Sequence, residues 1–178
     1  MIAFIGGGAR SGKSGYAERL ARQWWGERGG ELWYLATARA GDGEMAERIA
    51  RHRRQRGEGW QTLEAPLALD AALDEVAPGE TVLLDCLTLW ASQWRYGGGG
   101  SDAEGRALLA KVLGEAKRRR IALVVVSNDI NEGLPAEDGE TRAFVAFLQG
   151  LHRDLAAEAD LVVQVVAGLP WVWKGEGA

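Results

Sequence analysis

Eight residues near the start of the chain constrain its fold more than any other feature. The segment Gly7–Ser14 reads GGARSGKS and matches the pattern G-x-x-x-x-G-K-[ST]. The apolar run Ile2–Ile5 leads into it, and Ser14–Trp25 follows with the composition of a helix. A strand, a glycine-rich turn and a helix in this order allow main-chain N–H groups to curl around a chain of phosphates. The segment therefore predicts an α/β protein that binds a nucleoside triphosphate.

The rest of the chain alternates short apolar runs with longer amphipathic stretches. Apolar runs with little polar alternation indicate strands buried on both faces, and we predict them at Ile2–Ile5, Glu31–Ala36, Thr81–Asp85, Ile121–Ser127 and Leu161–Val166. Helices are predicted at Lys13–Glu27, Gly43–Arg56, Leu67–Val76, Ala103–Arg119 and Glu140–Glu158, and Trp171–Lys174 is a candidate edge strand. This alternation predicts a three-layer P-loop NTPase-like (RecA-like) fold, in which a mostly parallel sheet carries helices on both faces.

Length and composition narrow the class of protein. The 178 residues suit one nucleotide-binding domain over residues 1–178, and the net charge of −4 argues against nucleic acid as a partner. The apolar runs are shorter than the roughly 20 residues that cross a bilayer as a helix, so no membrane span is expected. The single cysteine, Cys86, cannot form an internal disulfide, which fits the cytoplasm. Cys86 itself is expected to be a small apolar residue at the end of a strand.

The phosphate loop assigns roles to individual side chains. Lys13 is expected to reach the β- and γ-phosphates, and the Ser14 hydroxyl is expected to bind Mg²⁺. The strand Thr81–Asp85 ends in an acidic residue. Because the carboxyl ends of parallel strands meet at one edge of the sheet, Asp85 is a second candidate ligand for Mg²⁺, although an aspartate there could equally cap a helix.

The predicted helix Gly43–Arg56 contains five arginines around His52. Such a stretch is often a solvated surface helix whose charges are partly neutralised by glutamates one turn earlier. The alternative is catalytic, because a neutral imidazole can attack a nucleoside α-phosphate while guanidinium groups stabilise the departing pyrophosphate. The basic cluster lies in an acidic protein with only two histidines, which supports the catalytic alternative. From the residues alone, however, the surface helix stays the preferred interpretation.

The chain resembles the bifunctional adenosylcobinamide kinase/adenosylcobinamide-phosphate guanylyltransferases of cobalamin biosynthesis. The resemblance covers nearly the whole length and includes Gly6–Ser14, Tyr34–Ala38 and Val126–Asp129. Its most specific runs are Asp42–Arg53 and Asp85–Trp90. It implies a homotrimer that phosphorylates adenosylcobinamide with ATP or GTP. It further implies transfer of GMP from GTP to the resulting phosphate through guanylylated His52, giving adenosylcobinamide-GDP and pyrophosphate.

On this resemblance His52 and Lys13 are the predicted catalytic residues. The predicted nucleotide-binding residues lie in the loop, in the arginine-rich segment and at two further acidic positions: Gly7, Gly8, Ala9, Arg10, Ser11, Gly12, Lys13, Ser14, Arg48, Arg51, Arg53, Glu64 and Asp85. Mg²⁺ is the expected cofactor, with Ser14 and Asp85 as its protein ligands.

Several positions depart from the pattern of that family. Asp129 stands where the family has a glutamate, Asn131 replaces a glycine, and Gln93 stands where an asparagine is usual. In the last helix an Asn-Gln pair is replaced by His152-Arg153, and His152 is expected to be a surface or interface residue. These departures affect the expected corrinoid contacts and the expected kinase activity. Two alternatives remain: an enzyme with only one of the two activities, and a nucleotide-dependent regulatory switch.

Overall fold

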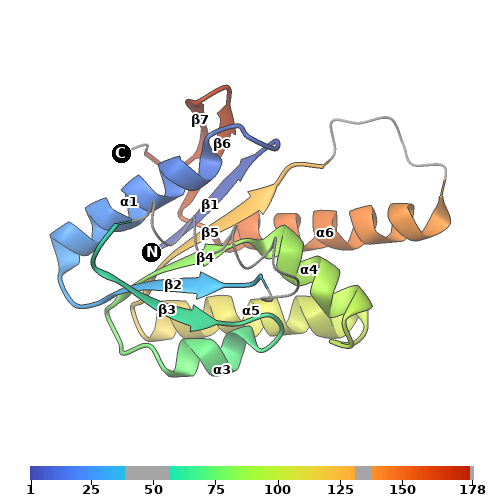
Figure 1. The fold of residues 1–178 in the computed structure, drawn as a ribbon, viewed down its shortest axis with the longest axis horizontal. Coiled ribbons are helices and arrows are strands. Elements are labelled where there is room, and N and C mark those ends of the chain that lie inside the picture. The colour runs from blue at the N-terminus through green and yellow to red at the C-terminus, as the bar shows by residue number, and fades with distance from the viewer. Residues whose placement is uncertain (39–56, 131–137, 177–178) are drawn as a thin grey trace.

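A computed structural model describes residues 1–38, 57–130 and 138–176, and these form a seven-stranded sheet between two layers of helices (Figure 1). The sheet has the order β3-β2-β4-β5-β1-β6-β7. Its strands are β1 (Ile2–Gly7), β2 (Leu32–Ala36), β3 (Trp60–Glu64), β4 (Thr81–Asp85), β5 (Ala122–Asn128), β6 (Leu161–Val166) and β7 (Leu169–Lys174). All neighbours pair in parallel except β6 and β7, which are antiparallel.

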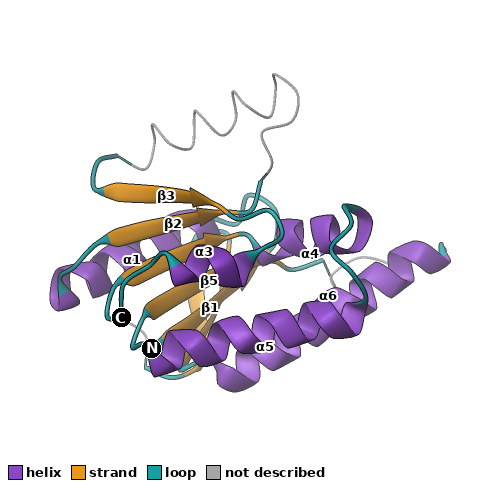
Figure 2. Ribbon diagram, turned by 90° about the horizontal axis from the view of Figure 1, so that it is seen from below, coloured by secondary structure: helices purple, strands orange, loops and turns teal. Residues whose placement is uncertain are grey.

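Helices cover the sheet on both faces (Figure 2). On one face, α1 (Lys13–Arg28) contacts β1, β4, β5 and β6. The other face carries α3 (Leu69–Asp74), α4 (Leu87–Tyr96), α5 (Asp102–Arg118) and α6 (Gly139–Glu158). The predicted mostly parallel sheet with helices on both faces is therefore confirmed.

Two apolar clusters, one on each face, hold the layers together. Under α1, the side chains of Ala3 and Ile5 pack with Leu20 and Trp24. On the opposite face, the alternate strand residues Ile2 and Phe4 belong to the cluster below α3, α4, α5 and α6. Successive strand residues thus point to opposite faces and both faces are dry, which explains why the central strands are continuous apolar runs.

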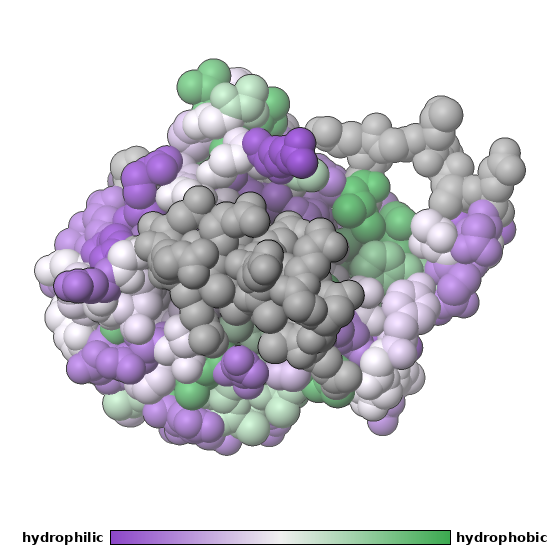
Figure 3. All heavy atoms as spheres, in the orientation of Figure 1, coloured by the Kyte–Doolittle hydropathy of each residue, from purple (hydrophilic) through white to green (hydrophobic). Residues whose placement is uncertain are grey.

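Strand β7 is the exception, because all of its residues are exposed. Leu169, Trp171 and Trp173 are 73%, 63% and 67% exposed. Apolar atoms accordingly gather at the top of the molecule in Figure 3, over the β6–β7 hairpin. By contrast Trp24 and Trp90 are buried, so the tryptophans do not share one role.

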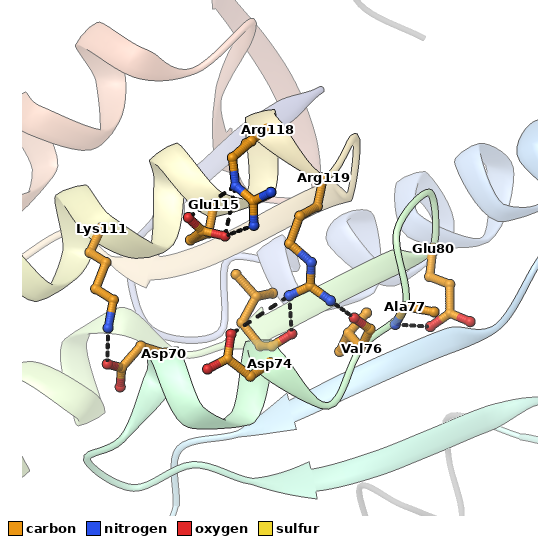
Figure 4. Close-up of polar contacts among 10 residues, drawn as sticks. Asp70, Asp74, Val76, Ala77, Glu80, Lys111, Glu115, Arg118 and Arg119 are labelled. Carbon is orange, nitrogen blue, oxygen red and sulfur yellow. Dashed lines mark hydrogen bonds and ion pairs between the residues drawn. The ribbon is translucent and has the colours of Figure 1, made fainter.

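Polar contacts fix α3 against α5 (Figure 4). Lys111 Nζ donates to Asp70 Oδ2 at 2.8 Å, and Arg119 donates to the carbonyl oxygens of Leu73, at 2.8 Å, and of Val76. The Arg119 side chain is only 12% exposed, so its charge binds the carbonyl groups at the end of α3, where the helix dipole is negative. Helix α3 thereby covers the part of the sheet formed by β2 and β4.

The structure differs from the sequence-based elements in specific places. Strand β3 and helix α4 were not predicted, and α3 is shorter than the predicted Leu67–Val76. The edge strand near the C-terminus is confirmed and begins two residues earlier, at Leu169. The predicted helix Gly43–Arg56 lies outside the described residues. Within the described ranges no helix combines the length and the apolar character needed to cross a membrane.

Candidate functional site

The loop between β1 and α1 has the conformation that the glycines predict. Gly12 adopts a left-handed φ of 91°, and Gly7 has a φ of 156°. A Cβ at Gly7 would lie 2.5 Å from the Val165 main-chain oxygen and 2.6 Å from Ser11 Oγ, so only glycine fits there. Arg10, with a φ of 60°, is a non-glycine residue in the left-handed region. The loop is thus a tight curl held against β6.

The N-terminus of α1 is suited to an anion. The helix has no side-chain cap and no acidic residue in its first turn. Helices α5 and α6 differ, because Ser101 caps α5 in a capping box with Glu104 and Asp138 caps α6. First-turn N–H groups need acceptors, and the positive end of the helix dipole favours negative ones. The first turn of α1 is therefore open to an anion such as a phosphate group.

Lys13 is the charged group of this loop and is only 7% exposed. Its Nζ donates a hydrogen bond of 2.9 Å to the main-chain oxygen of Gly8. Burial lowers the pKa of Lys13 from its ordinary value, while Cys86 and the Asp85 carboxylate oppose this shift. Burying an ammonium group is costly unless anions lie close to it, so an added phosphate is stabilised at this position.

The loop borders a cavity of about 720 Å³, which we call the loop cavity. Its described lining comes from the loop and from the ends of β4 and β5: Ala9, Arg10, Ser11, Gly12, Lys13, Ser14, Gly15, Asp85, Cys86, Asn128, Asp129 and Ile130. All these residues lie at the carboxyl edge of the sheet, where α/β folds bind ligands. Ser11 Oγ is buried there and makes no hydrogen bond within the described part of the chain.

Ser14 and Asp85 fit a magnesium ion. Both line the loop cavity, and both offer the oxygen ligands that Mg²⁺ prefers. Tyr34 Oη donates to Asp85 Oδ2 at 3.1 Å, which orients the carboxylate. Among the described residues no group of three or more His, Cys, Asp or Glu side chains could hold a metal. One hydroxyl and one carboxylate suit an ion that takes its remaining ligands from phosphates and water.

Cys86 follows Asp85, and its thiol is a poor nucleophile at neutral pH. Burial and the adjacent carboxylate raise the pKa of its thiol to about 11, so the thiol is protonated at neutral pH. Its main-chain N–H and carbonyl both bond to Thr37 Oγ1, each at 2.9 Å. Gln93 Nε2 donates to the Thr37 carbonyl oxygen. These contacts join β2, β4 and α4 behind the loop cavity.

A chain of hydroxyl groups connects the loop cavity to α6. The Asn128 main-chain N–H donates to Thr88 Oγ1 at 2.7 Å, and Thr88 Oγ1 lies 2.8 Å from Ser127 Oγ. Ser127 Oγ in turn lies 2.7 Å from His152 Nε2. His152, which was predicted as a surface or interface residue, is half-buried within this chain, and its ring centroid lies 5.1 Å from that of Phe4. The sequence gives no local signal for this contact between distant segments.

The structure brings part of the predicted site together. Ala9–Ser14 and Asp85 line one cavity, and Gly7 and Gly8 lead into it. Glu64 is exposed at the end of β3, two strands away from β4, and is not among the described lining residues. His52, Arg48, Arg51 and Arg53 lie outside the described residues. Asn128 and Asp129 also line the cavity.

Comparisons with known proteins identify relatives over the whole chain. Residues 3–172 match the family model "Cobinamide kinase / cobinamide phosphate guanyltransferase". The bifunctional adenosylcobalamin biosynthesis protein CobP of Pseudomonas aeruginosa is 44% identical over 178 residues, with 99% of each chain covered. The protein CobU of Escherichia coli, with the same description, is 32% identical over 181 residues, covering 95% of this chain and 97% of that protein.

A solved structure supports the fold alone. A KaiC-like protein of Pyrococcus horikoshii superposes with a TM-score of 0.56 at 12% sequence identity, covering 92% of this chain and 69% of the other. The RecA-like fold class predicted from the sequence is therefore confirmed. The family resemblance is confirmed separately, by the family model and the two relatives. The chain belongs to the cobinamide kinase / cobinamide phosphate guanyltransferase family, a family of transferases.

Proposed function

We propose that this chain phosphorylates the aminopropanol hydroxyl of adenosylcobinamide with ATP or GTP and then transfers GMP from GTP to the new phosphate. The products are adenosylcobinamide-GDP and pyrophosphate. Membership of the family supports the two activities. The uncapped α1 N-terminus beside buried Lys13 is the observation that carries the proposal, because it is a site for the phosphates that both reactions need.

In the kinase reaction the loop holds the triphosphate and Lys13 lies against its β- and γ-phosphates. The substrate hydroxyl attacks the γ-phosphorus in line, and the bond from that phosphorus to the bridging oxygen breaks, so that a nucleoside diphosphate leaves. Ser14 and Asp85 would hold Mg²⁺, which neutralises phosphate charge when bound. The protein contributes positioning and a dry, positively charged cradle.

In the guanylyl transfer His52 attacks the α-phosphate of GTP and pyrophosphate leaves. The phosphate of adenosylcobinamide phosphate then attacks the same phosphorus and releases the histidine. Arg48, Arg51 and Arg53 are proposed to stabilise the departing pyrophosphate, and Glu64 is proposed to contact the nucleotide.

Labelling with GTP that carries a radioactive α-phosphate tests the nucleophile. We expect label on the protein that is labile in acid and stable in base, the behaviour of a phosphoramidate, and its absence from His52→Ala. The chain has only one other histidine, so His152→Ala is the matched variant. Label that disappears in His152→Ala and persists in His52→Ala would show that His152, and not His52, is the nucleophile.

A second assay separates the alternatives. Transfer of the γ-phosphate of ATP to adenosylcobinamide, abolished in Lys13→Ala, supports the kinase half. Protein label without this transfer would leave a guanylyltransferase alone, and the converse would leave a kinase alone. Nucleotide hydrolysis with neither transfer would favour a regulatory switch.

We further propose a homotrimer of single-domain subunits, each spanning residues 1–178, that works in the cytoplasm. The family resemblance supports the trimer, and the single cysteine accords with a reducing compartment. Sedimentation of the purified protein tests the trimer directly, because a particle of one or two chain masses would contradict it.

A further inference from the structure

A second, smaller cavity of about 210 Å³ lies beside the loop cavity, and we call it the edge cavity. Its lining includes Phe4 of β1, His152 of α6, and Gln164 and Trp173 of the β6–β7 hairpin. Asp129 lines both cavities. A molecule that fills the edge cavity therefore lies directly beside the place where the loop would hold phosphates.

The polar groups of the edge cavity are neutral except for Asp129. Burial lowers the pKa of His152 to about 4, although the Asp129 carboxylate opposes the shift. At neutral pH the imidazole is therefore uncharged, with Nε2 paired to Ser127 Oγ at 2.7 Å. Gln164 is held by long hydrogen bonds, because its Nε2 donates to Asp129 Oδ2 at 3.5 Å and its Oε1 accepts from Trp173 Nε1 at 3.3 Å. Such long bonds are easily exchanged for bonds to a ligand.

Outside the edge cavity, the β6–β7 hairpin presents an aromatic shelf, which consists of Leu169, Trp171 and Trp173. Trp171 pairs with Gln164 across the hairpin and Trp173 Nε1 donates to the Gln164 side chain, so both indoles lie on one face, with their rings 6.3 Å apart. Because Trp173 also lines the edge cavity, the shelf and the cavity are continuous. Lys174 ties this strand to α6 by donating to the Ala156 and Ala157 carbonyl oxygens at 3.1 and 2.9 Å.

We propose that the aromatic shelf and the edge cavity form the acceptor subsite, in which the flat corrin ring lies on Trp171 and Trp173 and one of its carboxamide side chains enters the cavity. This inference rests on the function proposed above. A cobinamide combines a broad, largely apolar ring system with neutral amide side chains, and this matches two exposed indoles beside an uncharged imidazole and a side-chain amide. Asp129 then lies at the boundary that the substrate hydroxyl must cross to reach the phosphates.

A second copy of the chain is a weaker candidate for the shelf. Pro170 has no N–H group and so weakens β7 as an edge for strand addition. Subunit packing would also leave the polar groups of the edge cavity, and its continuity with the loop cavity, without a role. Both features are accounted for when the acceptor of the phosphoryl group occupies the surface.

Equilibrium dialysis of adenosylcobinamide against the full chain tests the proposal. We expect Trp173→Ala and Trp171→Ala to raise the Kd for adenosylcobinamide by about tenfold or more, through loss of ring contact. Val172→Ala is the matched control, because Val172 lies on the same strand and points to the opposite face. His152→Asn, which removes the ring from the edge cavity, is expected to raise the same Kd, while the Kd for ATP stays that of wild type in all four variants.

The outcomes are separable. Wild-type protein that neither binds nor phosphorylates adenosylcobinamide would refute the proposed function itself. Wild-type protein that does both, together with tryptophan variants whose Kd for the corrinoid is unchanged, would refute only the acceptor subsite. A changed sedimentation mass in Trp171→Ala or Trp173→Ala would assign the shelf to a contact between subunits and overturn the proposal.

Discussion

Protonation of His152 should make the stability of this protein depend on pH in a defined window. The folded protein holds the pKa of His152 at about 4, against an ordinary value of 6.5 for an unfolded chain. Between these values the unfolded state binds more protons, so the free energy of unfolding rises with pH. The stabilisation is complete above pH 6.5 and is lost as the pH falls towards 4.

The size of the effect follows from the same two values. Their difference corresponds to about 3 kcal/mol, and solvent access to the half-buried ring reduces this to about 2 to 3 kcal/mol. Urea unfolding of wild type and of His152→Asn at several values between pH 7 and pH 4.5 measures it. Between pH 7 and pH 4.5, the free energy of unfolding of wild type should fall by about 2 to 3 kcal/mol more than that of the variant. The carboxylates and His52 are present in both proteins, so their effects cancel in the comparison.

Parallel stability profiles for the two proteins would refute this reasoning. They would mean that the ring of His152 is as accessible to protons in the folded protein as in the unfolded one. The contacts with Phe4 and Ser127 would then not persist in solution, and the edge cavity would lose its neutral imidazole.

Three further predictions use the glycines and the cysteine. Gly7→Ala should lower the free energy of unfolding by about 1 to 3 kcal/mol, because its Cβ would lie 2.5 Å from a main-chain oxygen, whereas a Cβ at Gly8 meets nothing within 4 Å and Gly8→Ala should unfold like wild type in the same urea titration. In α5, Gly105→Ala should destabilise the protein, because a Cβ there would lie 2.8 Å from two aromatic side chains. A Cβ at Gly114 in the same helix meets nothing within 4 Å. Gly114→Ala should therefore raise the thermal midpoint, because alanine favours the helix over glycine by about 0.5 to 1 kcal/mol. Cys86, whose thiol pKa is raised to about 11, should react with iodoacetamide at pH 8 at least roughly tenfold more slowly in the folded protein than in urea, as followed by mass spectrometry.

The sequence predicted the central strands and the phosphate loop because both depend on local patterns. Thr81–Asp85 and Leu161–Val166 are observed with the predicted bounds, since a strand buried on both faces is a continuous apolar run. Strand β3 was missed for the converse reason. Its sequence, WQTLE, belongs to an exposed edge strand and lacks such a run.

The sequence of helix α4 contains the apolar spacing of a helix, although this helix was not predicted. Leu87, Trp90 and Ala91 are its buried residues, and Trp94 packs beside them. This spacing of three, four and seven residues is that of one helix face. The helix starts at Leu87 and only Cys86 separates it from β4, so its apolar residues merge in the sequence with those of the strand.

The departures from the family pattern are instructive because two of them meet in space. Asp129 follows β5 and His152 lies in α6, yet both line the edge cavity. Sequence alone presents these as separate substitutions at unrelated positions. Their common location shows that residues far apart in the sequence shape one surface, next to a phosphate loop in which main-chain geometry requires glycine at position 7.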